Sequence, residues 1–69
     1  MDLKRVESSH LKEAGYDPEE RKLVVVLHSG KTYTYFSVPP EVYEAFLGAK
    51  SVGAFFNRSI RGQFHFTKE

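Results

Sequence analysis

The sequence predicts an α+β domain: a three-stranded antiparallel β-meander followed by two α-helices packed on one face, with an extended C-terminal tail. Two observations carry this prediction. In the first half of the chain, short runs of β-branched and apolar residues are separated by turn residues, which is typical of strands. In the second half, apolar residues recur three and four positions apart behind a Pro-Pro pair, which is typical of helices.

Length and composition indicate one small domain. A chain of 69 residues has room for a single core, so we expect one domain over residues 1–69, with its core at about 6–64. The sequence holds no cysteine, which excludes disulfides and thiolate metal sites. Together with the charged N-terminal segment and the lack of an apolar run of ~20 residues, this predicts a cytoplasmic protein without a membrane partner.

The strands of the meander follow in order. Residues 11–16 predict a first strand, in which Gly15 is a candidate β-bulge, and residues 17–20 predict a turn that begins with Asp17-Pro18. Residues 23–28 are apolar on both faces and predict the central strand.

A hairpin is expected next. Ser29-Gly30 predicts a two-residue turn, with residues 31–36 as the returning strand. Counting outward from that turn places His28 opposite Lys31, Val26 opposite Tyr33 and Val24 opposite Tyr35. The period of two then puts Tyr33 and Tyr35 on the same face. Counting alone does not decide which face meets the helices.

The helices have recognisable start and stop signals. Pro39-Pro40-Glu41 predicts the start of the first helix, and Ser51 predicts the cap of a second helix over residues 52–61 that Gly62 ends. The expected apolar stripes are Val42, Ala45, Phe46 and Ala49 on the first helix and Val52, Phe55, Phe56 and Ile60 on the second. The alternating tail, residues 63–67, predicts either a short extra strand or an extended segment laid over the core.

Several short motifs, in order, resemble the KTSC domain family, which is named for its occurrence at the C-terminus of some lysyl-tRNA synthetases. The resemblance runs from about Val6 to Phe64, and Ala14 departs from the larger aliphatic residue expected there. The matching segments are Val6-Glu-Ser-Ser9, Gly15-Tyr-Asp-Pro18, Tyr33-Thr-Tyr35, Val38-Pro-Pro40, Ser51-Val-Gly53 and Phe55-Phe-Asn-Arg-Ser-Ile-Arg61. The family brings no established activity, but its association with a synthetase suggests nucleic-acid binding. The catalytic core of a synthetase is absent from this sequence.

The candidate binding residues are Tyr33, Tyr35 and Lys31 on the hairpin and Arg58 and Arg61 on the second helix. Tyrosine rings can stack on unpaired bases, and arginine offers a planar fork for phosphate oxygens. Each group also has a structural alternative. The tyrosines can pack against the helices, and the arginines can belong to a solvated helix face.

Catalytic and metal sites are not indicated. His10, His28 and His65 fall on three different segments without helical ligand spacing, and the serines lack a nucleophile context. We therefore expect a non-catalytic module without a cofactor or metal. RNA or single-stranded DNA is the first expected partner, and a protein that binds an exposed aromatic patch or sheet edge is the second. The net charge of +1 favours the protein partner, whereas the family resemblance favours nucleic acid.

Overall fold

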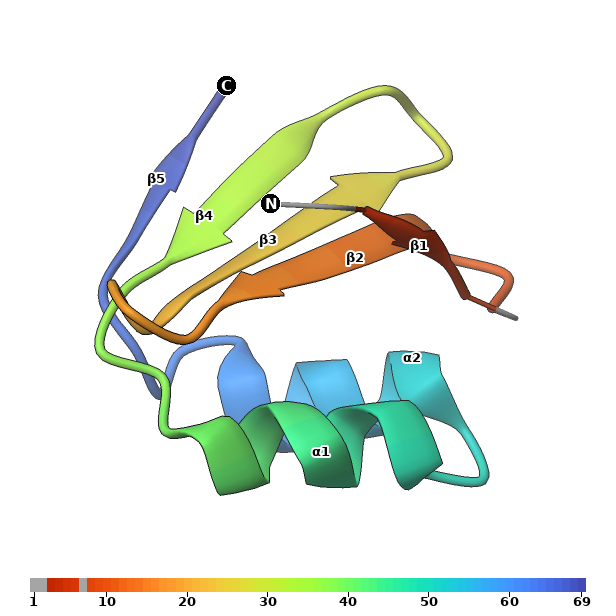
Figure 1. Cartoon of the computed structure of the whole chain (residues 1–69). Coiled ribbons are helices and arrows are strands. Elements are labelled where there is room, and N and C mark those ends of the chain that lie inside the picture. The colour runs from red at the N-terminus through yellow and green to blue at the C-terminus, as the bar shows by residue number, and fades with distance from the viewer. Residues whose placement is uncertain (1–2, 7) are drawn as a thin grey trace.

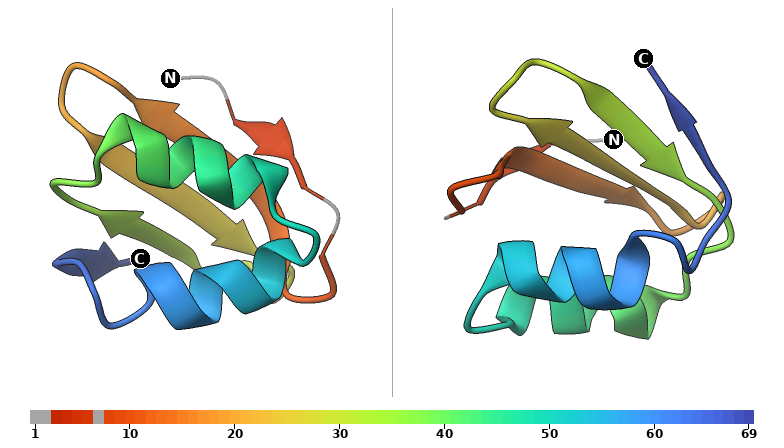
Figure 2. Two further views of the ribbon diagram at one scale, coloured as in Figure 1. Left: turned by 90° about the horizontal axis from the view of Figure 1, so that it is seen from below. Right: turned by 180° about the vertical axis from the view of Figure 1, so that it is seen from behind.

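The computed structural model describes residues 3–6 and 8–69, and it shows one antiparallel sheet with helices on one of its faces (Figure 1). The sheet has five strands in the order β1-β2-β3-β4-β5. These are β1 (Lys4–Arg5), β2 (Leu11–Asp17), β3 (Lys22–Leu27), β4 (Thr32–Tyr35) and β5 (Phe66–Lys68). Between β4 and β5 the chain forms α1 (Pro40–Gly48), α2 (Val52–Phe55) and the π-helical turn η1 (Phe56–Ile60). Figure 2 shows these helices side by side beneath the sheet.

The predicted α+β class is confirmed, but the predicted three strands are too few. β1 and β5 extend the meander at its two edges, with two and three residues respectively. β5 also decides between the two expectations for the tail, because Tyr35 pairs with Phe66 and Tyr33 with Lys68. Glu7, part of the Val6–Ser9 motif, lies outside the described residues, as do Met1 and Asp2.

The irregularity in β2 lies elsewhere than predicted. Gly15 pairs regularly with Val24, whereas the register shifts between Leu11 and Glu13. The prediction of a bulge at Gly15 is therefore wrong. The extra residue near the start of β2 alters the direction of the chain just after His10.

The β3–β4 hairpin has a three-residue loop, not the predicted two-residue turn. The Leu27 N–H donates to the Lys31 carbonyl at 2.9 Å, and the Gly30 N–H donates to the Leu27 carbonyl at 2.9 Å. Gly30 has a φ of 96°, which is the left-handed residue that such a loop needs after its first turn.

This loop shifts the register by one residue. Tyr33 lies opposite Val25 and Tyr35 opposite Leu23, so the predicted pairs of Tyr33 with Val26 and His28 with Lys31 are wrong. A slip of one residue exchanges the faces of a strand. The two tyrosines still share a face, but it is the face that the helices cover.

The core lies between that face and the helices. Its buried residues come from every layer: Leu11, Ala14, Leu23, Val25, Tyr35, Val38, Phe46, Val52, Phe56 and Ile60. In the predicted helix stripes, Phe46, Val52, Phe56 and Ile60 are buried, whereas Ala45 is exposed. Tyr43, which was not part of the predicted stripe, is half-buried, and its ring centroid lies 6.4 Å from that of Phe46.

The second helix starts as predicted and changes character halfway. The Ser51 hydroxyl accepts a hydrogen bond from the Ala54 N–H at 3.3 Å, which confirms the predicted cap. At the other end, the Arg61 N–H donates to the Phe56 carbonyl at 2.8 Å, five residues back. The predicted α-helix over 52–61 is therefore α2 followed by a π-turn, and Gly62 ends it with a φ of 80°.

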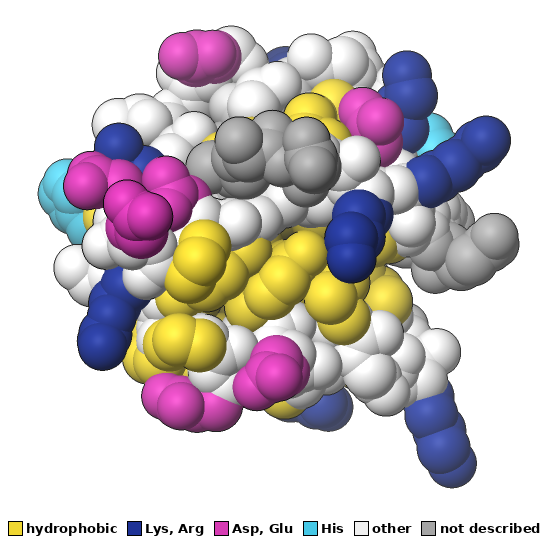
Figure 3. Space-filling model, viewed as in Figure 1, with side chains coloured by type: hydrophobic (Ala, Val, Ile, Leu, Met, Phe, Trp, Pro, Cys, Tyr) yellow, Lys and Arg dark blue, Asp and Glu magenta, His cyan; other side chains and the backbone are white. Residues whose placement is uncertain are grey.

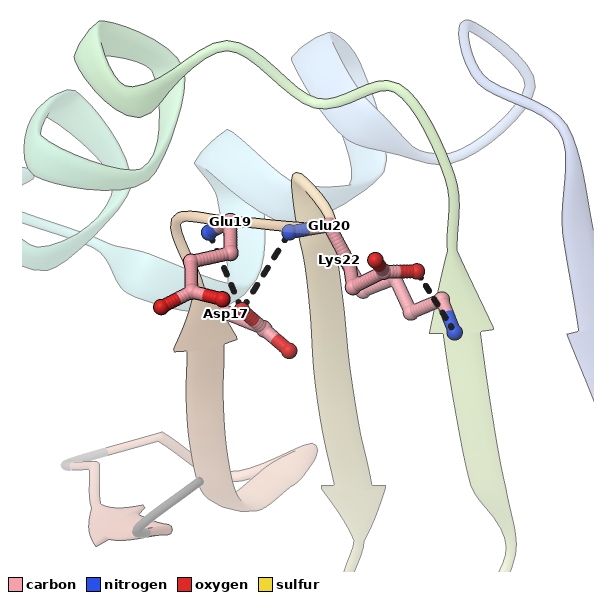
Figure 4. A network of polar contacts seen from close by, with 4 residues as sticks. All are labelled: Asp17, Glu19, Glu20 and Lys22. Carbon is pink, nitrogen blue, oxygen red and sulfur yellow. Dashed lines mark hydrogen bonds and ion pairs between the residues drawn. The ribbon is translucent and has the colours of Figure 1, made fainter.

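Near α1, two tyrosines and an acidic turn lie at the edge of the face that the helices cover. The Tyr16 hydroxyl donates to the Val38 carbonyl, and the Tyr16 ring stacks on Tyr43 with 4.8 Å between centroids. In the adjoining turn, Asp17 accepts hydrogen bonds from the Glu19 and Glu20 N–H groups at 3.0 and 3.2 Å (Figure 4). We call this region the acidic side; its acidic members are Asp17, Glu19, Glu20, Glu41 and Glu44.

Candidate functional site

Three adjoining cavities lie where the start of β2, the β3–β4 loop and η1 meet. His10 lines all three, and we call the three neighbouring cavities together the groove. The aromatic cavity, of about 350 Å³, is lined by His10, Leu27, Tyr33, Tyr35, Phe56, Asn57, Arg61, Gly62 and Phe66. The serine cavity, of about 450 Å³, is lined by Ser8, Ser9, His10, Lys50, Ser51, Gly53, Ala54 and Asn57. The third, of about 340 Å³, lies between the segment before β2 and the hairpin loop and is lined by Ser9, His10, Leu27, His28 and Ser29.

The exposed aromatic surface of the groove is Phe66 beside Tyr33. Their ring centroids are 5.8 Å apart in an edge-on arrangement, and Phe66 is 46% exposed. Tyr35 is only 2% exposed, because it packs edge-on against Phe56 at 5.6 Å in the core. Tyr35 is therefore a structural residue beneath the groove, and Tyr33 and Phe66 hold the ring surface that a ligand can reach.

The predicted basic residues separate into two sets. Arg61 lines the aromatic cavity with Asn57, four residues earlier on the same helical segment. Arg58 and Lys31 are exposed and line none of the three cavities. Lys68 pairs with Tyr33 across neighbouring strands, which places its side chain on the same face of the sheet.

Charge is distributed unevenly over the molecule. Among the described lining residues of the groove there are two permanent cations, Lys50 and Arg61, and two histidines, but no carboxylate. Acidic side chains gather instead over the β2–β3 turn and along α1, on the face shown in Figure 3. In the described part of the chain, the ion pair found is Lys22 with Glu20 at 3.7 Å, on that acidic side.

Arg61 also influences the tyrosine below it. Burial raises the pKa of Tyr35, the neighbouring Tyr33 raises it further, and the charge of Arg61 opposes both. The guanidinium therefore lies close enough to the groove floor to act on it electrostatically, while Arg61 itself is exposed.

The histidines do not form a metal centre. His10 and His28 both border the groove, whereas the ring of His65 lies against Phe36, 6.3 Å between centroids. The His28 Nε2 atom is 2.9 Å from the Ser8 carbonyl oxygen, which ties the hairpin loop to the segment before β2. Over residues 3–6 and 8–69, no group of three or more possible ligands is placed to hold a metal ion.

Sequence reasoning missed several groove residues. Ser8, Ser9, His10, Lys50 and Phe66 reach the groove from separate segments. A partial signal existed, because the Val6–Ser9 and Ser51–Gly53 motifs both contribute to one cavity, but their proximity is a tertiary property. No helix in the described part of the chain has the length and apolar character to cross a membrane.

Known relatives include free-standing proteins and parts of larger ones. A protein of Tsukamurella paurometabola is 44% identical over 62 residues, covering 90% of this chain and 92% of that protein. An uncharacterized protein of Stutzerimonas stutzeri is 46% identical over 65 residues, covering 91% and 92%. The lysine–tRNA ligase of Nostoc punctiforme is 39% identical over 64 residues, which cover 93% of this chain but 11% of the ligase.

The fold agrees with a crystal structure of a KTSC domain protein from Yersinia pestis. The two superpose with a TM-score of 0.93 at 36% identity, covering 99% of this chain and 96% of the other. The family profile described as KTSC domain matches residues 7–64. This chain therefore belongs to the KTSC domain family.

Proposed function

We propose that the domain is a non-catalytic module that binds single-stranded nucleic acid, RNA in particular, along the groove. A base stacks on Phe66 and Tyr33, and Arg61 holds a neighbouring phosphate. The single observation that carries this proposal is the composition of the groove. Its described lining joins exposed rings to cations and histidines without a carboxylate, although the chain as a whole is nearly neutral.

Magnitudes favour a weak and sequence-tolerant interaction. Stacking of a base on an aromatic side chain contributes about 1–3 kcal/mol and depends little on the base. Few cations are available, so we expect a Kd of ~10–100 μM, near the range of non-specific binders, with a modest salt dependence. The proposed surface differs from the one expected from sequence, because Tyr35 is buried below it and Lys31 and Arg58 line none of its cavities.

The preference for RNA rests on the relatives. The segments similar to this chain in lysine–tRNA ligases make up 11% of those proteins, which by their name act on tRNA. A module that adds weak RNA contacts suits that setting and needs no catalytic residues of its own. A cytoplasmic location belongs to the same proposal.

A protein partner is the second candidate, and one observation favours it. β5 is an edge strand, and its Phe66 is among the exposed large apolar residues. An exposed edge can pair with a strand of another chain. Such a partner would contact the β5 backbone, whereas a nucleic acid would contact the groove side chains.

A titration followed by NMR distinguishes the two. We expect single-stranded RNA of about eight nucleotides, within the site sizes of small single-strand binders, to shift the amide signals of Tyr33, Arg61 and Phe66. The shifts should decrease as salt rises, and a duplex of the same sequence should produce weaker ones. The absence of any shift at millimolar RNA and low salt would overturn the proposal and make binding of a protein partner the leading hypothesis.

A matched pair of variants locates the surface. Phe66→Ala should weaken binding at every salt concentration, because it removes the exposed ring of the groove. Phe36→Ala is the control, since Phe36 lies against His65 and below the Lys22 ammonium, outside the groove lining. Equal loss of binding in the two folded variants would contradict the assigned surface.

A further inference from the structure

We propose that the serine cavity is a phosphate subsite of the groove, so that the bound strand spans from a base at Phe66 to a phosphate at Lys50. This inference rests on the proposed function and deepens it. The lining of the cavity is mostly polar and, among the described residues, contains no Phe or Tyr and no carboxylate. Its polar members are Ser8, Ser9, His10, Lys50, Ser51 and Asn57.

The hydroxyl groups of this cavity are set up as donors. The Ser8 Oγ atom accepts hydrogen bonds from the N–H groups of His10 and Leu11, at 3.1 and 3.3 Å. The Ser51 Oγ atom accepts one from the Ala54 N–H. A serine hydroxyl has two acceptor sites and one proton, so Ser8 retains only its proton for a ligand. The Ser8 hydroxyl can therefore only donate to a ligand, which favours a ligand that accepts hydrogen bonds.

Lys50 adds a charge to these donors. It lies in the α1–α2 connection, is exposed, and has no carboxylate within ion-pair distance in the described part of the chain. An ammonium offers three donors and no acceptor. Hydroxyl protons and an ammonium around one cavity match the oxygens of a phosphate group, which accept hydrogen bonds and carry negative charge.

The Ser8 hydroxyl lies directly against Gly53 of α2. A Cβ atom added at Gly53 would lie 2.9 Å from the Ser8 Oγ atom, closer than side chains normally approach. Glycine at this position therefore lets the segment before β2 sit directly on α2. At this point the two motifs that build the cavity, one before β2 and one at the start of α2, approach each other closely.

The serine cavity is next to the aromatic cavity, with which it shares two lining residues. His10 and Asn57 line both cavities, so a strand that leaves the Phe66 ring can pass these two residues and reach Lys50. The repeating alternation of base and phosphate in a nucleic acid fits a groove that alternates aromatic and donor-rich sections. A protein strand at β5 has no need of the serine cavity.

The test uses NMR chemical shifts with three probes: inorganic phosphate, uridine, and the RNA oligonucleotide with or without a 5′-phosphate. Phosphate should shift the amide signals of Ser9, Ser51 and Ala54, and uridine those of Tyr33 and Phe66. The oligonucleotide should shift both groups of signals. If the 5′-phosphorylated form binds more tightly, the subsite takes a terminal phosphate, and if both bind equally, it takes an internal phosphodiester.

Two lysine variants provide the control. Lys50→Gln should weaken phosphate binding about tenfold, the equivalent of one charge-assisted hydrogen bond. Lys31→Gln makes the same change of charge at an exposed residue outside the groove and should leave phosphate binding unchanged. Equal effects of the two variants, or equal shifts with chloride at the same ionic strength, would overturn the subsite.

The two proposals fail in different ways. If the oligonucleotide shifts Tyr33 and Phe66 but no probe shifts the serine cavity, the phosphate subsite is wrong and nucleic-acid binding stands. If the oligonucleotide shifts no signal at all, the proposed function is wrong. Binding of inorganic phosphate in that case would show an anion site without a nucleic-acid partner and would also overturn the subsite as part of a strand-binding groove.

Discussion

The acidic side and the groove both contain tyrosines from the covered face of the sheet, but they use them differently. At the acidic side, the Tyr16 hydroxyl donates to the Val38 carbonyl and its ring is stacked on Tyr43. In the groove, Tyr33 contacts Phe66, and no hydrogen bond of the Tyr33 hydroxyl is found within the described part of the chain. The comparison teaches that Tyr16 serves the fold with both its ring and its hydroxyl, whereas Tyr33 keeps a hydroxyl that a ligand can use.

The largest expected effect is the loss of stability in Phe56→Ala, because Phe56 lines the groove and also belongs to the core. Phe56→Ala removes a ring that is 6% exposed and packs edge-on against Tyr35. Core changes of this kind cost about 3–5 kcal/mol of unfolding free energy. A domain of this size has a stability at the low end of about 5–15 kcal/mol, so most of it would be lost.

Urea unfolding followed by circular dichroism measures this loss. Asn57→Ala, at the exposed neighbouring position, is the control and should leave the unfolding midpoint nearly unchanged. A midpoint for Phe56→Ala close to that of wild type would show that the floor of the groove is not part of the stabilising core.

A smaller effect is expected when the hydroxyl of Tyr16 or of Tyr33 is removed, and the two losses of unfolding free energy should differ. Tyr16→Phe leaves the Val38 carbonyl without its donor, and we expect a loss of about 1–2 kcal/mol in unfolding free energy. Tyr33→Phe, the same change in the groove, should alter stability by less than about 0.5 kcal/mol. Equal losses of unfolding free energy in urea would show that the hydroxyls of Tyr16 and Tyr33 contribute equally to stability.

The sequence predicted the elements of the fold better than their register. The cap at Ser51, the Pro-Pro helix start and the central strand all depend on local chemistry, and each is present. The hairpin depended on whether its loop has two residues or three, and a glycine at Gly30 suits both. A stronger signal was the alternation of Thr32 and Thr34 with the tyrosines, which favours threonines on the solvent face.

The edge strands and the groove were harder to predict, for different reasons. β1 has two residues, too few for a period of two to be recognised, whereas the alternation in the tail gave a strand, now β5, as one of two expectations. In the groove, Arg61 and Tyr33 were expected from their chemistry and do share a cavity. His10 and Phe66 were not, because only the tertiary fold brings the segment before β2 beside the C-terminal strand.

Alkaline pH should reduce the contribution that three tyrosines make to the stability of the fold. Burial raises the pKa of Tyr16, Tyr35 and Tyr43 above the ordinary value of about 10. The unfolded chain therefore loses these protons first as the pH rises. The contribution of these groups to stability is complete below about pH 10 and is lost as the pH rises through their folded pKa values.

Unfolding measured across this range tests that contribution. The difference in stability between wild type and Tyr16→Phe should narrow above about pH 10, because the wild-type hydroxyl then ionises more readily in the unfolded chain. A constant difference between about pH 7 and pH 11 would show that the Tyr16 hydroxyl does not respond to its burial.

The smallest expected effect concerns two arginines three residues apart. Arg61 lines the groove and acts on Tyr35, whereas Arg58 is exposed outside it. A cation that contacts a phosphate releases counterions, so Arg61→Gln should reduce the slope of log affinity against log salt by about 0.7 for single-stranded RNA. Arg58→Gln makes the same change of charge without a groove contact, so it should lower affinity slightly through long-range attraction and leave the slope almost unchanged. Fluorescence anisotropy with labelled RNA at several salt concentrations measures both. A larger change of slope for Arg58→Gln than for Arg61→Gln would place the nucleic acid on the outer surface of the helix and not in the groove.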